Sequence, residues 1–218
     1  MKQKLSIATM VMVGLASVGC GGIFGGEDLV PVEVRLVQDL PATMTADILF
    51  SEQGAVAVPI QVGDVLSLVF TVDSIQFLPL AADDAESAWQ SLDVDPVEID
   101  LAALPTSGNP PLVVAAGALP AGDYRQVRLF VSGATITFAN PISLGNAKTF
   151  DADTPYPVEI PSASNTGIKT DLSFSVVDDG MGNTLGVELM FEPTASYQNV
   201  NVTGAGTVMM APVIKNNA

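Results

Sequence analysis

The sequence has no histidine, one cysteine and one tryptophan in 218 residues, and only eight basic side chains. Without histidine there is no Ser-His-Asp triad, no Cys-His dyad and no histidine-ligated zinc site, and the most common general base is missing. A single cysteine cannot form a disulfide within the chain. The enzymatic mechanisms that remain open use carboxylate pairs, Ser-Lys pairs or metals held by oxygen ligands.

The shortage of basic residues leaves a strongly acidic chain. Without Lys2 and Lys4, six basic residues face 24 acidic ones, a net charge of −18. Such a surface repels nucleic acid and anionic lipid headgroups, so we expect no nucleic-acid partner. Charged residues nevertheless make up only 15% of the chain and hydrophobic ones 48%. This composition indicates an apolar body with acidic loops rather than a disordered acidic tail.

The one cysteine, Cys20, follows a segment that is typical of a secretory signal. Lys2 and Lys4 form its positive start, and the apolar stretch after them is too short to span a bilayer as a helix. We predict that residues 1–19 are a lipoprotein signal peptide and that Cys20 is the acylated, palmitate-bearing N-terminus of the mature protein. Ser17 stands where the usual lipobox has leucine, so an ordinary cleaved signal is the alternative.

Residues 20–28 are rich in glycine and are predicted to form a flexible tether. By resemblance to the sorting rule of Gram-negative lipoproteins, Gly21 in place of aspartate favours the outer membrane. The expected location is the cell envelope, with the protein lipid-anchored in the outer membrane of a Gram-negative bacterium. The acyl chains must supply the attachment, because the mature chain has no basic patch for lipid headgroups.

Residues 29–218 are expected to form a single all-β domain, an antiparallel sandwich of about eight strands. Alternation of period two is clearest at residues 168–176, where Ile168, Leu172 and Phe174 share one face. Further strands are expected at residues 29–37, 48–50, 56–60, 65–77, 124–131, 185–191 and 207–214. Fifteen prolines and nineteen glycines punctuate the chain at close spacing, as in sandwiches, and residues 81–92 are the one modest helix candidate.

Several segments resemble, in the correct order, a bacterial and archaeal envelope family known as domain of unknown function 4382. The best matches are Leu119-Pro120-Ala121-Gly122-Asp123-Tyr124-Arg125-Gln126-Val127-Arg128-Leu129, Ile160-Pro161-Ser162 and Thr166-Gly167-Ile168-Lys169. Weaker matches extend the resemblance over about residues 65–215. It implies an Ig-like or transthyretin-like sandwich on secreted, often lipidated proteins, and it implies no chemistry.

The best-matching segment also has a structural interpretation. Residues 120–123 form a turn that leads into a strand. Tyr124 is expected to hydrogen-bond back across this corner, like the tyrosine corner of Greek-key sandwiches. Arg125 and Arg128 are expected on opposite faces of the strand, with one of them in a buried ion pair.

Acidic pairs recur in the predicted loops, where oxygen-rich side chains hold calcium in many extracellular modules. The weak calcium candidates are Asp83, Asp84, Asp178 and Asp179. None has the spacing of an EF-hand or a nonapeptide calcium repeat. The alternative is solvated carboxylates that keep the protein soluble. Ser162 and Lys169 lack the Ser-x-x-Lys context of a catalytic dyad.

Two classes of function remain open. The first is a non-catalytic binding or structural module on the outer membrane, which contacts an envelope protein or a glycan and needs no cofactor. The second is a carboxylate-dependent glycan-processing hydrolase, with a calcium-dependent glycan or adhesion module as a further variant. Trp89, Tyr156 and Tyr197 are the candidates for stacking on a glycan. Acids converging in a pocket beside Trp89 would favour the hydrolase, and scattered acids would favour the module, which we expect.

Overall fold

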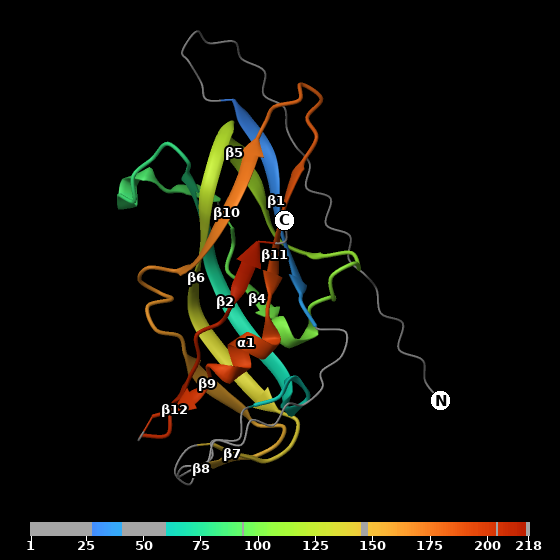
Figure 1. Ribbon diagram of the computed structural model, residues 1–218, viewed down its shortest axis with the longest axis vertical. Coiled ribbons are helices and arrows are strands. Elements are labelled where there is room, and N and C mark those ends of the chain that lie inside the picture. Colours follow the sequence, from blue (N-terminus) through green and yellow to red (C-terminus); the bar gives the residue numbers. More distant parts are fainter. Residues whose placement is uncertain (1–27, 41–59, 93, 145–147, 204, 217–218) are drawn as a thin grey trace.

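The structure is a computed structural model that describes residues 28–40, 60–92, 94–144, 148–203 and 205–216. Its described part is mostly β-strand, and two sheets pack around one apolar core (Figure 1). The predicted all-β sandwich is confirmed. The predicted signal, the tether up to residue 27, the acylation site Cys20 and the strands expected at residues 48–50 and 56–59 lie outside the described residues.

The larger sheet is built on two long antiparallel strands, β2 (Val65–Pro79) and β6 (Gly122–Phe138), which pair along most of their length. On its other edge, β2 pairs with β3 (Gln90–Leu92) and β4 (Val97–Asp100). The other edge of β6 pairs first with β10 (Ile168–Val176) and then with β9 (Pro155–Glu159). Beyond β9 lie β13 (Val208–Met209) and β12 (Asn201–Val202).

The smaller sheet has the order β14 (Ile214–Asn216), β11 (Leu185–Phe191), β1 (Leu29–Gln38) and β5 (Leu112–Pro120). Strands β1 and β11 are parallel, and the other neighbours are antiparallel. A separate hairpin is formed by β7 (Ile142–Leu144) and β8 (Lys148–Phe150). The helical elements are α1 (Pro193–Gln198) and short 3-10 turns at Val62–Asp64, Glu86–Ala88 and Leu101–Ala103. None of the helices in the described ranges has the length and apolarity that a membrane crossing requires.

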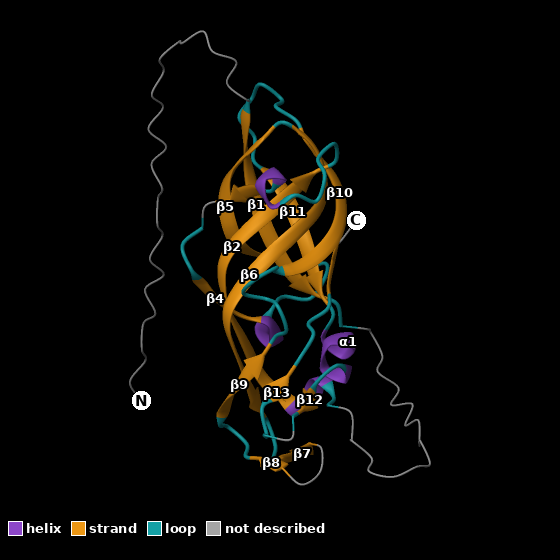
Figure 2. Ribbon diagram, turned by 90° about the vertical axis from the view of Figure 1, so that its left-hand side faces the viewer, coloured by secondary structure: helices purple, strands orange, loops and turns teal. Residues whose placement is uncertain are grey.

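Contacts between the two sheets join both edges of the sandwich. On one edge the Thr170 hydroxyl of β10 donates to the carbonyl of Ile214 in β14 at 2.8 Å. On the other edge Gly117 of β5 lies against Leu92 of β3, where a Cβ atom would come within 2.6 Å of a Leu92 methyl carbon. Glycine at this position therefore allows β3 to approach β5. Figure 2 shows the strands of the two layers crossing around the enclosed core.

An aromatic cluster fills the core behind the turn between β5 and β6. The rings of Tyr124 and Phe174 stack with centroids 5.2 Å apart, and Phe77 meets both edge-on. The Tyr124 hydroxyl donates to the carbonyl of Pro120 at 2.9 Å, which confirms the predicted corner bond. Leu172, which the alternation placed on one face with Phe174, is buried in the core, and Phe174 is half-buried against it.

Two predictions about secondary structure were wrong. The helix candidate at residues 81–92 is an irregular segment with a 3-10 turn and then β3. A helix of that length is marginal alone, whereas pairing residues 90–92 with β2 satisfies the backbone and buries Leu92 completely. The strand expected at residues 207–214 is two short strands, β13 and β14, which pair with different sheets.

The packing of Phe174 predicts a clear difference between neighbouring positions on β10. Phe174→Ala removes the ring that stacks on Tyr124 and should lower the free energy of unfolding by about 3 kcal/mol. Ser173→Ala, on the exposed face, is the control and should change it by less than about 0.5 kcal/mol. Urea denaturation measures the free energy of unfolding of both variants. Equal losses at the two positions would contradict this assignment of faces.

Candidate functional site

The connection between β2 and β3, residues 80–89, meets the outer face of the larger sheet through Arg128. Since Val127 and Leu129 of β6 face the core, the Arg128 side chain points outward, yet it is only 2% exposed. Its guanidinium donates to both carboxylate oxygens of Glu86, at 2.9 Å for the Nη1–Oε2 pair, and from Nε to Gln76 Oε1 at 2.8 Å. Arg128 thus ties this connection to both long strands.

The same guanidinium lies over Trp89. Its central carbon is 4.1 Å from the centroid of the Trp89 ring and 4.8 Å from that of Phe130. The ammonium of Lys169 is 5.5 Å from the Trp89 ring. Cation–π contacts are strongest where water is excluded, and Trp89 is only 8% exposed. The indole therefore packs against cations of its own chain, and its ring does not form an open platform for a sugar.

Arg125 holds the same connection at a second point. Its Nη2 atom donates to Asp84 Oδ1 at 2.7 Å and to the carbonyl of Ala82 at 3.1 Å. The prediction that Arg125 and Arg128 lie on opposite faces is therefore wrong, because both reach the connection between β2 and β3. The predicted ion pair is made by Arg128 with Glu86, but only its arginine is buried and the glutamate is exposed.

A bulge in β6 explains why the two arginines share a face. Pro79 of β2 pairs with Tyr124, but the preceding Leu78 pairs with Gln126, so Arg125 is an extra residue in its strand. The extra residue shifts the alternation by one position. Consistent with this shift, Tyr124 and Val127 are three residues apart and both lie in the core.

The ionised form of Glu86 is stabilised by its contact with Arg128. The hydrogen bond from the Arg128 guanidinium lowers the pKa of Glu86 below its usual value, and the charges of Arg128 and Lys169 add to this effect. The carboxylate keeps solvent contact at its outer side, since 76% of the Glu86 side chain is exposed. Glu86 is therefore held as an anion by a structural cation, which is unsuited to a general acid.

The remaining basic side chains of the described residues also have partners in their own chain. Arg35 pairs with Glu33, and Lys215 pairs with Glu192. Lys148 contacts the carbonyl of Gly206 and lies over the ring of Phe150. With Arg125, Arg128 and Lys169 engaged as described above, these contacts account for all six basic residues after Lys4.

The four calcium candidates lie in two separate loops. Asp83 accepts from the backbone of Ala85, and Asp84 pairs with Arg125. Asp178 and Asp179 accept backbone hydrogen bonds within their own turn, and Asp179 also accepts from Asn183. These bonds lower the pKa of Asp179. Among the described residues, no three acidic or cysteine side chains gather as a metal site would require.

The other candidates from the sequence are also engaged in the fold. Tyr197 is 1% exposed against Phe191, and burial raises the pKa of its hydroxyl. Tyr156 packs edge-on to Phe150 and accepts from the backbone of Asp151 at 2.8 Å. Ser162 has a positive φ of 62° and accepts the turn hydrogen bonds of residues 165 and 166 through its carbonyl, while Lys169 lies over Trp89.

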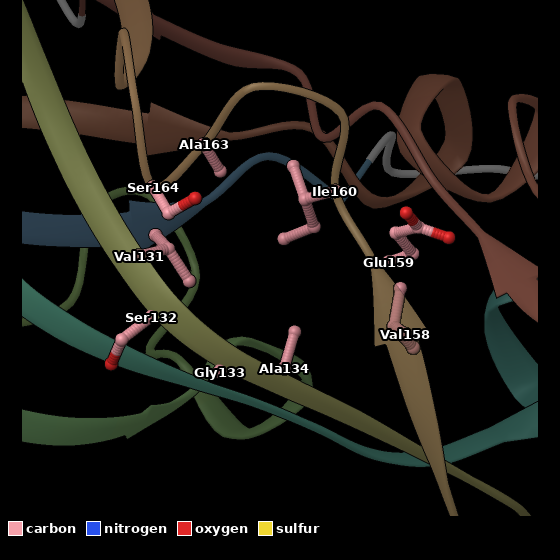
Figure 3. A pocket seen from close by; sticks show the side chains of 9 residues that line it. All are labelled: Val131, Ser132, Gly133, Ala134, Val158, Glu159, Ile160, Ala163 and Ser164. Atoms are coloured by element: carbon pink, nitrogen blue, oxygen red, sulfur yellow. The ribbon is translucent and has the colours of Figure 1, made fainter.

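A pocket of about 190 Å³ opens where β6 changes its partner. Pairing with β10 ends at Leu129 and pairing with β9 begins at Thr135, and between them Val131 donates to the carbonyl of Ala163. Figure 3 shows apolar side chains around the opening and the carboxylate of Glu159 pointing away from it. The pocket is smaller than the 300–1,000 Å³ or so of typical ligand sites. Its lining contains a single carboxylate.

Comparison with known proteins places the chain in a family. A family model described as "Domain of unknown function (DUF4382)" matches residues 57–212. The chain belongs to this family, and the resemblance of the motif around Tyr124 is confirmed. No curated protein and no solved structure matches the chain.

The buried position of Arg128 predicts a large effect of its removal. Arg128→Met keeps much of the aliphatic stem but loses the stacking on Trp89 and the bonds to Gln76 and Glu86. We expect a loss of about 2–3 kcal/mol and a change in the emission of the single tryptophan. Arg35→Met breaks a partly exposed pair and should cost under about 1 kcal/mol. Urea unfolding followed by fluorescence compares the two, and equal losses would contradict a special role of Arg128.

The lowered pKa of Glu86 predicts an acid dependence. A carboxylate whose pKa is lower in the folded state stabilises that state above its unfolded pKa, and the gain is lost as the pH falls through the folded pKa. Glu86→Gln should therefore be less stable than wild type at pH 7, and the difference should be smaller at pH 2. Urea unfolding at both pH values, read from Trp89 emission, measures it. Glu98→Gln, on exposed β4, controls for the change in net charge.

Proposed function

We propose that this protein is a non-catalytic lipoprotein of the cell envelope, anchored through acylated Cys20 in the outer membrane, whose sandwich binds an envelope protein or a glycan. The surroundings of Trp89 carry this proposal. A hydrolase would bring acids together in a pocket beside Trp89, but Glu86 and Asp84 are instead bound by Arg128 and Arg125. The residues that resemble the family most closely thus stabilise the fold.

The distribution of charge supports a ligand that is neutral or cationic. All six basic residues after Lys4 are engaged within the chain, as shown above, while acidic residues outnumber them four to one in the mature chain. An anionic polysaccharide would find no free cation among the described residues and would meet a field of its own sign. A neutral glycan, an aminated glycan or a basic protein surface is compatible with this field.

The pocket at β6 also supports the non-catalytic module rather than the hydrolase. Glycoside hydrolysis needs two carboxylates on either side of a sugar, roughly 5–10 Å apart. The pocket offers only Glu159, whose carboxylate points away from the opening (Figure 3). The acids of the described loops bind backbone amides and arginines instead.

Cell fractionation tests the anchor. Cys20→Ser removes the sulfur that would carry the acyl chain, and the protein is expected to move from the membrane fraction to the soluble fraction. Mass spectrometry of the wild-type N-terminus should find an acylated Cys20. An unmodified N-terminus at another residue would overturn the anchor.

Binding to defined glycans tests the ligand. The full chain, solubilised in detergent, is applied to neutral, aminated and sulfated polysaccharides, and retention is expected on the first two and not on the sulfated polymer. Chromatography of the polysaccharides after incubation is the measurement for catalysis, and no shortening is expected. Release of oligosaccharides that stops in Glu159→Gln would overturn the non-catalytic proposal in favour of the hydrolase. Retention on the sulfated polymer alone would overturn the electrostatic argument.

A further inference from the structure

One end of the sandwich exposes large apolar side chains around the turn between β5 and β6. We call this the tether end and define it by Leu29, Leu80, Val177 and Met181. Leu29 and Met181 are 64% and 76% exposed, respectively, and the other two exceed one half. Apolar side chains of this size are individually unremarkable on a surface, but four at one end form a candidate contact area.

Backbone pairing brings these four positions to the same turn. Leu29 is paired with Pro120, and Leu80 donates its backbone N–H to the carbonyl of Asp123 at 2.7 Å. Val177 follows directly on Val176, which pairs with Gly122, and Met181 lies in the loop that continues from there. Figure 1 shows the start of β1, the turn between β5 and β6 and the loop after β10 together at one end.

The remaining large exposed apolar side chains do not belong to this area. Leu66 lies at the start of β2. Leu112 and Val113 pair with residues near the end of β1, and Leu40 lies just after that end.

The chain enters the domain at this end. The carbonyl of Asp28, the first described residue, accepts the backbone N–H of Ala121 at 2.9 Å, which fixes the point of entry at the turn. From Cys20 to Asp28 the chain spans at most about 29 Å when fully extended. Strand β6 alone, with 17 residues, is about 55 Å long. A lipid anchor at Cys20 therefore keeps the tether end near the bilayer whatever the tether's conformation.

We propose that the tether end rests on the membrane surface, with Leu29, Leu80, Val177 and Met181 in the interface of zwitterionic lipid. This inference rests on the anchor at Cys20 proposed above. The same end is negatively charged, because Asp28, Asp178 and Asp179 are exposed and stand within two residues of Leu29, Val177 and Met181 in the sequence. Anionic headgroups would repel them, whereas a zwitterionic surface would not. The domain would thus stand with the hairpin β7–β8 and strand β12 directed away from the bilayer (Figures 1 and 2).

Site-specific labelling tests the orientation in the lipidated full chain. Because Cys20 is consumed by acylation, Met181→Cys and, separately, Val177→Cys provide single thiols for a fluorophore. Asn201→Cys, exposed on β12 at the far end, is the matched control. Each labelled protein is bound to phosphatidylcholine vesicles that contain nitroxide-labelled lipid. Fluorophores at positions 177 and 181 should be quenched at least threefold more strongly than the one at 201.

Further variants and vesicles distinguish the effect of the apolar side chains from that of the lipid charge. Adding Leu29→Ser and Leu80→Ser to Met181→Cys should reduce the quenching at position 181 at least twofold. Replacing half of the phosphatidylcholine in the vesicles by phosphatidylglycerol should reduce it by a similar factor. Equal quenching at 181 and 201 in protein that sediments with the vesicles would overturn this inference and leave the anchor standing. Protein that does not sediment with vesicles would overturn the anchor and this inference together. A dimer in detergent that the two serine substitutions abolish, with no quenching at 181, would assign the tether end to a second copy of the chain instead.

Discussion

The buried guanidinium of Arg128 is the interaction on which the outer part of the larger sheet depends. A cation at 2% exposure is costly unless its hydrogen bonds are satisfied, and here Gln76, Glu86 and two aromatic faces replace the lost water. Its contacts hold the connection between β2 and β3 against the sheet. The connection leads directly into β3. Leu92 of β3 packs on Gly117 and so joins the edges of the two sheets.

The same arrangement limits what the surface can bind. All six basic residues after the first four positions make contacts within the chain, although only Arg128 is buried, and acidic residues outnumber them four to one. The arginines of the family motif are therefore best understood as structural cations. We therefore propose that a partner is recognised through neutral hydrogen bonding, apolar contact or its own positive charge.

The sequence predicted those parts of the fold in which one face is apolar and the backbone is regular. Strands β1 and β10 and the first half of β6 were located from alternation, β2 from a run that is mostly apolar on both faces, and the corner bond of Tyr124 from the turn residues before it. Strand β5 was missed because Ala115, Ala116 and Gly117 carry little strand signal, and β9 because Pro155 and Pro157 argue against a strand. Both segments become strands because neighbouring strands of their sheet pair with them.

The candidate site shows a different limit of sequence reasoning. Alternation places residues three apart on opposite faces, and a bulge of one residue reverses this result for everything beyond it. Regular alternation would place Tyr124 and Val127, three residues apart, on opposite faces, and only the extra residue at Arg125 brings both into the core. The convergence of Arg125 and Arg128 on one connection, and the cover of Trp89 by cations, followed only from the paired strands.

The tether end combines two opposing forces with different ranges. Apolar contact acts only when Leu29 and its neighbours touch the lipid, while repulsion between aspartates and anionic headgroups extends over a Debye length of about 8 Å at physiological salt. A domain already held near the bilayer by an acyl anchor needs little further attraction, because the anchor has removed most of the entropic cost of association. The balance at the tether end then decides orientation rather than attachment. On an anionic leaflet the acidic surface would be repelled, and the domain would lie away from the bilayer at the length of its tether. On a zwitterionic leaflet the four apolar side chains would contact the lipid and fix the orientation of the domain.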